Sequence, residues 1–380
     1  MLILFLASGC GTLKEVFQEI KEDVPTSENT YFDIQDISLA MLEAIERGEP
    51  EFTFNIAEFE EEDLAHLGDD MPTFWGRPDT YSVNHQFADM KDIAEDRTVD
   101  VKNVTANFKY SNNYYVYHHI VNGQEIPEDM PHARTVADML PVVANEIFSA
   151  LPEDASDYDK ALAAHDWLVA NLTYDDTVDN LSDMNGSYGA LYTRSTMCRG
   201  YAETFNLLMK CYTDVQTEEV VGDACQETGS SWLGHAWNIV YIDGAWRQVD
   251  ATFDDPENNP SGTVLHYYFG QSDDVMRVNH EWEASFYPAC EAEDFYYFRK
   301  SGLFAGDEDA FKEIVTGVFE GAEEDPEFLQ IAAVGVEPDK DNVQFIFGLK
   351  TDKKMSDSLY ISEQVYEDIH LLTMQFRYED

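Results

Sequence analysis

The amino-acid sequence predicts an α+β fold in which a helix carrying a cysteine packs on an antiparallel sheet carrying a histidine and an aspartate. After Cys198, apolar residues recur at helical spacing, without a proline, as far as Tyr212. Two later segments rich in Trp, Ile, Val and Tyr, residues 235–242 and 245–252, are joined by Asp243-Gly244, which is typical of a two-residue hairpin turn. Helix-then-strand patterns on both sides of this core predict two small flanking α+β units.

The N-terminal flanking unit is predicted to cover residues 31–130. A helical pattern over residues 36–47 ends at Gly48, and an alternating strand follows at residues 51–56. Its other strands are predicted at residues 101–110 and 114–120.

The predicted core covers residues 131–300 and begins with two helices. The first, at residues 135–150, is expected to be interrupted early by Pro141, because proline cannot donate a backbone hydrogen bond. The second, at residues 156–172, opens at Ser156 with a pattern that resembles a capping box.

The C-terminal flanking unit is predicted at residues 301–380 and repeats the order of a helix followed by strands. Its helix is expected near residues 308–320, and its strands at residues 330–336, 343–349 and 370–378. For both flanking units, packing against the core and gripping a surface polymer remain open as the role.

Three residues in the predicted core are the candidate catalytic residues: Cys198, His235 and Asp250. A thiol becomes nucleophilic near neutral pH when a base and a positive local field favour the thiolate. A helix that begins at Cys198 would supply unpaired N–H groups and the positive end of its dipole. The same N–H groups could form part of an oxyanion hole.

The register of the predicted hairpin brings the histidine and the aspartate to one face. Counting back from a two-residue turn places Trp237 opposite Asp250 and His235 opposite Thr252. Asp250 is then the diagonal neighbour of His235, about 7–8 Å away at the backbone, which a carboxylate and an imidazole can span. An aspartate there can hold one ring nitrogen and direct the other toward a thiol.

Three motifs contain these residues: Cys198-Arg199-Gly200-Tyr201-Ala202, His235-Ala236-Trp237-Asn238 and Asp250-Ala251-Thr252-Phe253-Asp254-Asp255. They resemble the transglutaminase-like superfamily, and in particular its bacterial lipoproteins, over roughly residues 135–300. The family pattern has Trp where this chain has Phe253, a swap that is expected to leave the site intact. The resemblance implies a papain-like fold and a thioester intermediate without a cofactor or metal, and it leaves the acyl acceptor open.

Other segments also agree with bacterial members of that family. They include the stretches that contain His165, His266 and His280. His165 falls on an apolar helical stripe, which favours a core histidine or one that supports the site from behind.

Two further clusters contain residue types that bind metal ions, but neither has the pattern of a metal site. Asp254, Asp255 and Glu257 could bind calcium, but they lack an EF-hand pattern, so a solvated loop is favoured. His118 and His119 are adjacent on a predicted strand, where neighbouring side chains face opposite ways.

The composition is strongly acidic. The 380 residues include 75 acidic and 23 basic residues, a net charge of −52, with 44% hydrophobic residues. Nucleic acids and anionic membranes would be repelled by such a charge, and neither is expected as a partner. The apolar fraction excludes wholesale disorder.

The N-terminus resembles a bacterial lipoprotein processing site. An apolar run from Leu2 ends in Ala7-Ser8-Gly9-Cys10, although no basic residues precede it. We expect lipidation at Cys10, with residues 1–30 serving as signal and tether. The protein would then be extracytoplasmic, and a lipid at Cys10 would be its link to the membrane.

The other cysteines, Cys211, Cys225 and Cys290, are too few for a disulfide framework or a zinc site. A bridge between Cys225 and Cys290 remains open.

Two classes of function fit these observations. The first is an extracytoplasmic thiol enzyme that acts on amide bonds of peptides, proteins or peptidoglycan, by hydrolysis or transamidation. The second is a cell-surface binding lipoprotein that uses the fold as a scaffold. The presence of all three candidate residues favours the enzyme.

Overall fold

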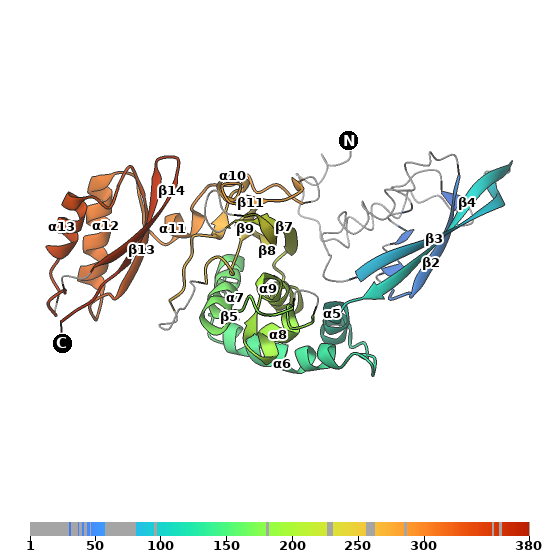
Figure 1. Cartoon of the computed structure of the whole chain (residues 1–380). Coiled ribbons are helices and arrows are strands. Elements are labelled where there is room, and N and C mark those ends of the chain that lie inside the picture. Colours follow the sequence, from blue (N-terminus) through green and yellow to red (C-terminus); the bar gives the residue numbers. More distant parts are fainter. Residues whose placement is uncertain are drawn as a thin grey trace. The chain divides into compact units, whose positions relative to one another are not determined.

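A computed structural model of the chain (Figure 1) divides into two compact units, residues 1–110 and 111–380. No helix among the described residues is long and apolar enough to span a bilayer. The structure describes the following residues, with side chains outside 81–102: 30–31, 37, 40–41, 44–45, 47–57, 81–94, 97–179, 182–225, 231–255, 263–284, 287–351, 353–356 and 359–379.

The first unit contains a four-stranded sheet with the order β1-β2-β4-β3. A helix is predicted at residues 36–47, and its described residues that face this sheet are helical. Among them, Met41 is buried with Phe54 and Val104. The strands predicted at residues 51–56 and 101–110 are confirmed, whereas β3 was missed. The strands are β1 (Thr30–Tyr31), β2 (Glu51–Ala57), β3 (Tyr81–Ala94) and β4 (Arg97–Tyr110).

The predicted strand at residues 114–120 is wrong, because this segment forms helix α5 (Asn112–Asn122) at the start of the second unit. The Ser111 hydroxyl accepts the Tyr114 N–H and caps the helix, and Gly123 ends it with φ of 70°. The two caps and burial of one aromatic face therefore outweigh the strand preference of a Tyr-rich segment.

Helices α6 (Pro131–Phe148) and α7 (Asp157–Asn171) follow. The expected interruption at Pro141 is wrong: α6 continues through it, with the proline exposed and Leu140 and Val143 buried in the main core. That burial offsets the hydrogen bond that proline cannot make. The predicted capping box at Ser156 is confirmed, since its side chain accepts the Asp159 N–H and Asp159 accepts the Ser156 N–H.

A five-stranded antiparallel sheet with the order β10-β9-β8-β7-β11 forms the centre of the second unit. Helix α9 (Cys198–Tyr212) packs against β8 and β7 (Figure 1). The predicted α+β core, with a helix that begins at the cysteine on an antiparallel sheet, is thereby confirmed. The strands are β7 (Thr217–Ala224), β8 (Leu233–Ile242), β9 (Ala245–Val249), β10 (Phe269–Gln271) and β11 (His280–Glu281).

The hairpin between β8 and β9 has the predicted two-residue turn. Asp243 and Gly244 have φ of 50° and 83°, as a type I′ turn requires, and Ile242 pairs with Ala245. The register continues until Asn238 pairs with Val249.

Strand β9 ends at Val249, so the predicted strand to Thr252 is wrong. Residues 251–254 form a turn, and His235 lies opposite Gly222 of β7 rather than opposite Thr252. Asp250 causes this turn, because its carboxylate accepts the backbone N–H groups of the residues two and three positions further on.

Several short elements complete this core. They are β5 (Thr173–Tyr174), α8 (Ser187–Tyr192), β6 (Ser195–Thr196), α10 (Asp273–Met276) and α11 (Tyr296–Lys300).

The C-terminal part of the second unit contains a four-stranded sheet with the order β12-β13-β15-β14. The helix predicted at 308–320 and the strands at 330–336 and 370–378 are confirmed. The strand at 343–349 is wrong, since Asp339 caps a helix there by accepting two backbone N–H groups. The elements are β12 (Phe304–Ala305), α12 (Glu308–Gly321), β13 (Phe328–Val334), α13 (Lys340–Phe347), β14 (Tyr360–Tyr366) and β15 (Ile369–Gln375).

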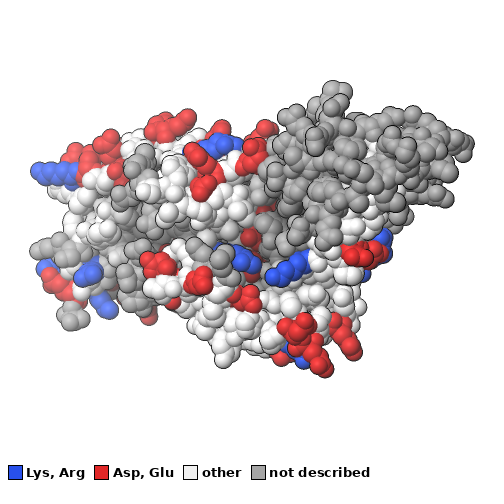
Figure 2. All heavy atoms as spheres, turned by 45° about the vertical axis from the view of Figure 1, so that its right-hand side comes forward, with Lys and Arg blue, Asp and Glu red and all other residues white. Residues whose placement is uncertain are grey.

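On the face drawn in Figure 2, the acidic side chains of the described residues form several separate groups, with a few basic side chains among them. The excess of negative charge is therefore distributed rather than gathered into one patch on that face.

Candidate active site

Cys198 is the first residue of helix α9, as the sequence predicts. The residue before it, Met197, is extended, and no side chain of the described residues caps this helix start. Gly200 lets the first turn approach β6, because a Cβ there would lie 2.1 Å from Thr196 Oγ1. Cys198 is 7% exposed, and its thiol lies where helix N–H groups and the helix dipole favour negative charge.

The thiol of Cys198 contacts the histidine strand. It forms a hydrogen bond with the His235 side chain, accepts the Ala236 backbone N–H and packs against Ala202 and Ala236. Burial raises the pKa of Cys198, but the hydrogen bond and charge of His235 and the Ala236 N–H lower it further than burial raises it. The net effect is a thiol whose pKa lies below its ordinary value.

His235 and Asp250 form a buried pair, with 2.7 Å between His235 Nε2 and Asp250 Oδ2. Burial lowers the pKa of His235, but the charge and hydrogen bond of Asp250 raise it to about 10. Because Asp250 occupies Nε2, Nδ1 is the ring nitrogen that remains for the sulfur of Cys198. The three side chains are thus connected in the order thiol, imidazole, carboxylate, and they can hold a thiolate beside an imidazolium.

Asp250 reaches His235 from a turn rather than from the predicted strand. Its Oδ1 accepts the N–H groups of Thr252 (2.9 Å) and Phe253 (3.1 Å), and its own N–H donates to the Tyr268 carbonyl. These bonds fix the carboxylate, leaving Oδ2 directed at His235. Burial raises the pKa of Asp250, but its imidazole partners lower it well below the ordinary value.

Aromatic rings enclose the imidazole of His235. The centroid of Trp237 lies 5.7 Å from that of His235 in a stacked arrangement, and the centroid of Phe253 lies 4.8 Å away. The indole N–H of Trp237 donates to Gln248 Oε1 at 2.7 Å, which fixes the ring. Phe253, which stands where the family pattern has Trp, therefore lies beside the imidazole.

His280, on β11, belongs to this site although sequence reasoning assigned it no role there. Its Nε2 lies 3.0 Å from Asp250 Oδ2, the same oxygen that His235 contacts. The side chain is fully buried. The only signal in the sequence was its place in a segment that agrees with the bacterial family members, and no spacing rule connects a strand 30 residues further on to Asp250.

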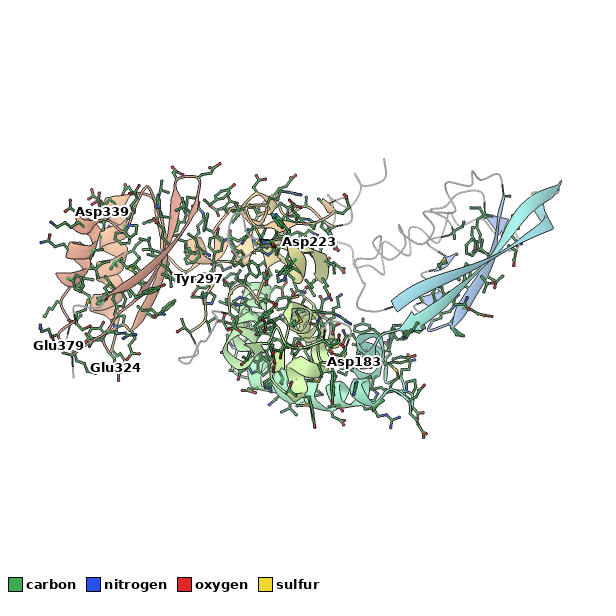
Figure 3. All side chains as sticks on the ribbon, viewed as in Figure 1. Asp183, Asp223, Tyr297, Glu324, Asp339 and Glu379 are labelled. Atoms are coloured by element: carbon green, nitrogen blue, oxygen red, sulfur yellow. The ribbon has the colours of Figure 1, made fainter. Side chains whose placement is uncertain are left out.

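His165 belongs to a second buried network, which contains no cysteine among the described residues. Its Nε2 lies 3.1 Å from Asp254 Oδ2, and its Nδ1 lies 3.0 Å from Asp166 Oδ1. Asp166 Oδ1 also lies 2.9 Å from His266 Nε2, and the ring of His266 stacks on Tyr297 (labelled in Figure 3). Burial lowers the pKa of His165, but the two carboxylates raise it to about 9.

The favoured interpretation of Asp254 and Asp255 as a solvated loop is wrong. Asp254 is fully buried on His165, and Asp255 accepts a hydrogen bond of 2.6 Å from the Tyr201 hydroxyl. Burial raises the pKa of Asp255 to about 6, although the hydrogen bond from Tyr201 lowers it. Glu257 lies outside the described residues.

Two trios of side chains in the described part of the chain have ligand atoms close enough to hold a metal ion, within 4.8 Å of one another. They are His165, Asp166 and His266, and His235, Asp250 and His280. In both trios the same atoms already form hydrogen bonds of 2.7–3.0 Å. A metal ion would have to displace those protons, so we interpret both trios as hydrogen-bonded networks.

The adjacent histidines named in the sequence are not part of this site. His118 and His119 are on helix α5 and contact Asn122 and the Gln124 carbonyl, respectively. Cys10 lies outside the described residues.

The cysteines with described positions, Cys198, Cys211, Cys225 and Cys290, all carry free thiols. The bridge left open between Cys225 and Cys290 is therefore absent here. Burial raises the pKa of Cys211 to about 12, and it raises the pKa of Cys290 as well. Cys198 differs from these two in that its pKa is lowered.

Comparison with known proteins gives one family and two curated relatives. Residues 145–251 match the model of the transglutaminase-like superfamily. Kyphoscoliosis peptidase from Mus musculus is 33% identical over 118 residues, and that from Homo sapiens is 31% identical over 118 residues. Each alignment covers 29% of this chain and 18% of the relative.

Two solved structures are also similar. A transglutaminase crystal structure shares 15% identity at a TM-score of 0.27, over 53% of this chain and 50% of that chain. A cysteine protease candidate from Cytophaga hutchinsonii shares 18% identity at a TM-score of 0.26, over 46% of this chain and 68% of that chain. Both TM-scores are low, so neither likeness is informative about the chemistry of this chain.

Proposed function

Because this chain contains a transglutaminase-like domain, we propose that it is a cysteine-dependent acyl-transfer enzyme acting on amide bonds. Cys198 is the nucleophile, His235 the general acid and base, and Asp250 the residue that orients His235. One observation carries the proposal: a thiol at an uncapped helix start contacts an imidazole whose far nitrogen is held 2.7 Å from a buried carboxylate.

In the first half of the reaction the thiolate of Cys198 attacks the carbonyl carbon of the amide, and the carbonyl electron pair moves onto the oxygen. The N–H groups at the start of α9 point toward that negative charge and stabilise it. When the carbon–nitrogen bond breaks, the imidazolium of His235 gives its proton to the departing amine. The product is a thioester on Cys198.

In the second half, an acceptor attacks the thioester while His235 removes its proton, and the thiolate leaves. Water as acceptor gives hydrolysis, and an amine gives transamidation. The substrates we propose are peptides, proteins or peptidoglycan, since these contain the amide bond that this chemistry requires. The net charge of −52 disfavours nucleic acid as a substrate.

The first experiment compares two cysteines of the same helix. Iodoacetamide at pH 6 should label Cys198 ahead of Cys211, and His235→Ala should remove that advantage without unfolding the protein. Equal labelling of Cys198 and Cys211 in the folded protein would contradict the proposal.

The second experiment identifies the substrate class. The protein is incubated with peptide libraries or peptidoglycan fragments, quenched in acid and analysed by mass spectrometry for an acyl adduct on Cys198, with Cys198→Ala as the control. An adduct on Cys198 names the acyl group. A reactive Cys198 that forms no adduct and cleaves none of these substrates would favour the binding lipoprotein.

We also propose that the protein is extracytoplasmic and lipidated at Cys10, on the basis of the apolar run that ends in Ala7-Ser8-Gly9-Cys10. Changing Cys10 to Ala should move the protein from the membrane fraction to the soluble fraction. Unchanged fractionation, with no lipid mass on Cys10, would refute the anchor.

A further inference from the structure

We propose that His280 is a positioning residue of the candidate active site. As a neutral imidazole it donates Nε2–H to Asp250 Oδ2, and this hydrogen bond weakens the attraction of Asp250 for the proton on His235. The inference rests on the proposed function and extends it to a residue outside the predicted trio. Its basis is that one carboxylate oxygen has two imidazole nitrogens within hydrogen-bond distance, His235 Nε2 at 2.7 Å and His280 Nε2 at 3.0 Å.

The partners of His280 determine which nitrogen carries its proton. Its Nε2 faces a carboxylate, which can only accept, so Nε2 must carry hydrogen. In the structure Asn279 Oδ1 lies 2.8 Å from His280 Nδ1, and Asn279 Nδ2 donates to the Tyr268 hydroxyl at 2.8 Å. The two ends of an amide have the same shape and are assigned from their partners. With the amide turned by 180°, Asn279 would donate to Nδ1 and accept the Tyr268 O–H, which a neutral His280 protonated on Nε2 requires.

The turned amide would complete a continuous buried chain of hydrogen bonds. In it Tyr268 would donate to Asn279, Asn279 to His280, and His280 to Asp250, which also contacts His235 beside Cys198. The orientation in the structure, with Asn279 Oδ1 at Nδ1, implies instead an imidazolium at His280 that donates from both nitrogens. Burial and the nearby charge of His235 oppose that form and lower the pKa of His280, although Asp250 and a hydrogen bond to the Met276 backbone raise it.

The titratable groups that face His280 are His235 on β8, Asp250 just after β9 and Tyr268 just before β10. The adjacent Glu281 on β11 is exposed. Asp250 is therefore the anion that both histidines contact, and a donor from one weakens its attraction for a proton on the other.

This sharing matters for the proposed reaction. An imidazolium held too firmly by Asp250 would give up its proton slowly to a departing amine and would serve poorly as the base in the second half. A neutral donor on the same oxygen disperses the carboxylate charge without adding a second positive charge. His280 thus lowers the pKa of His235 without contacting the thiol or the substrate.

The test uses two variants of the full chain. His280→Phe keeps the size and shape of the ring but removes both nitrogens, and His280→Gln keeps an N–H donor at similar reach. The pKa of the His235 imidazolium is measured by ¹⁵N NMR of histidine-labelled protein and, independently, from the alkaline limb of the Cys198 alkylation rate against pH. We expect His280→Phe to raise this pKa by about one unit and His280→Gln to leave it within about 0.3 units.

A fall or no change in the His235 pKa in His280→Phe, or equal shifts in both variants, would overturn the inference. If His280→Phe does not fold, the wild-type NMR spectrum decides: neutral His280 protonated on Nε2 supports the inference, and an imidazolium or an Nδ1–H form at pH 7 overturns it. Failure of the proposed function is distinguishable, because Cys198 alkylation would then be unaffected by His235→Ala, whatever the state of His280.

Discussion

The second unit contains two buried histidine–aspartate pairs, and their aspartates come from the same turn. His235 contacts Asp250 at 2.7 Å, and His165 contacts Asp254 at 3.1 Å. Asp254 donates its backbone N–H to the Asp250 carbonyl, so the two pairs are joined by one turn of chain. Both histidines are buried, and their carboxylate partners raise the pKa of each above its ordinary value.

The pairs differ in what occupies the second nitrogen of the imidazole. His165 has a carboxylate on each side, Asp254 at Nε2 and Asp166 at Nδ1, so neither nitrogen is left for a reacting group. His235 has a carboxylate on one side and the thiol of Cys198 on the other. A buried histidine–aspartate pair therefore does not by itself define an active site; the group at the second nitrogen makes the distinction.

The largest effect expected from this comparison concerns the two histidines. His235→Gln should reduce turnover, or Cys198 alkylation at pH 6 where no substrate is known, by roughly 10²–10⁴-fold, because the base and the charge beside the thiol are both lost. His165→Gln should leave the rate per folded molecule within a few-fold. It should instead lower the free energy of unfolding by about 3–5 kcal/mol, the usual result of breaking a buried ion pair.

Rates are normalised to the folded fraction from urea unfolding. A His165→Gln variant that is as inactive as His235→Gln while fully folded would remove the proposed distinction between the pairs.

The next effect concerns the two aspartates. Asp250→Asn keeps the shape of the side chain but removes the charge that stabilises the His235 imidazolium, so Cys198 alkylation should slow by about 10²-fold. The same change beside a serine nucleophile lowers the rate by roughly 10⁴-fold. The loss should be smaller here, because a partly ionised thiol depends less on its base. Asp254→Asn, in the His165 pair, should lower the melting temperature and leave alkylation nearly unchanged. Full reactivity in Asp250→Asn would show that the carboxylate does not act on His235.

A third effect is the pH dependence of stability from the His165 network. The pKa of His165 is about 9 in the fold against 6.5 ordinarily, so its contribution is complete below pH 6.5 and is lost as pH rises through about 9. For Asp166 burial raises the pKa, but its histidine partners lower it to about 2 from 3.8, so its contribution is present above pH 3.8 and is lost as pH falls through about 2.

Urea unfolding from pH 7 to 10 measures the alkaline side of this dependence. The free energy of unfolding should fall in the wild-type protein, by at most about 1.4 kcal/mol per pH unit for each proton involved. His165→Gln should show a shallower fall, because the contribution of His165 is lost while that of His235 remains. Identical slopes in the two proteins would mean that His165 is not held as an imidazolium.

The sequence predicted the parts of this arrangement that depend on local patterns. The helix start at Cys198 and the turn at Asp243-Gly244 follow from spacing and turn chemistry, and both are in the structure. Local preference failed where capping decided the outcome, as in α5 and α13, which begin at side-chain caps inside segments rich in strand-forming residues.

The geometry of the site was only partly accessible from the sequence. Asp250 was placed near His235, but through a strand register that ends at Val249 before reaching it. The actual link is a turn closed by hydrogen bonds to the Asp250 carboxylate itself. His280 and His165 reach their aspartates across 30 and 89 residues, distances at which neither periodicity nor turn chemistry carries information.

The smallest effect concerns the aromatic rings that border the two pairs. Phe253 lies 4.8 Å from His235, and Phe269 lies 5.0 Å from His165. Phe253 is half-buried, whereas Phe269 is fully buried in the main core. Phe253→Trp should therefore change Cys198 alkylation by less than threefold, because the indole can extend toward solvent while its face still covers the imidazole. Phe269→Trp should cost about 1–3 kcal/mol of stability, since a closed core has no room for the added ring. A large loss of Cys198 reactivity in folded Phe253→Trp would mean that the phenyl ring sets the position of His235, and the ring beside the reactive pair would then be as constrained as the ring beside the structural one.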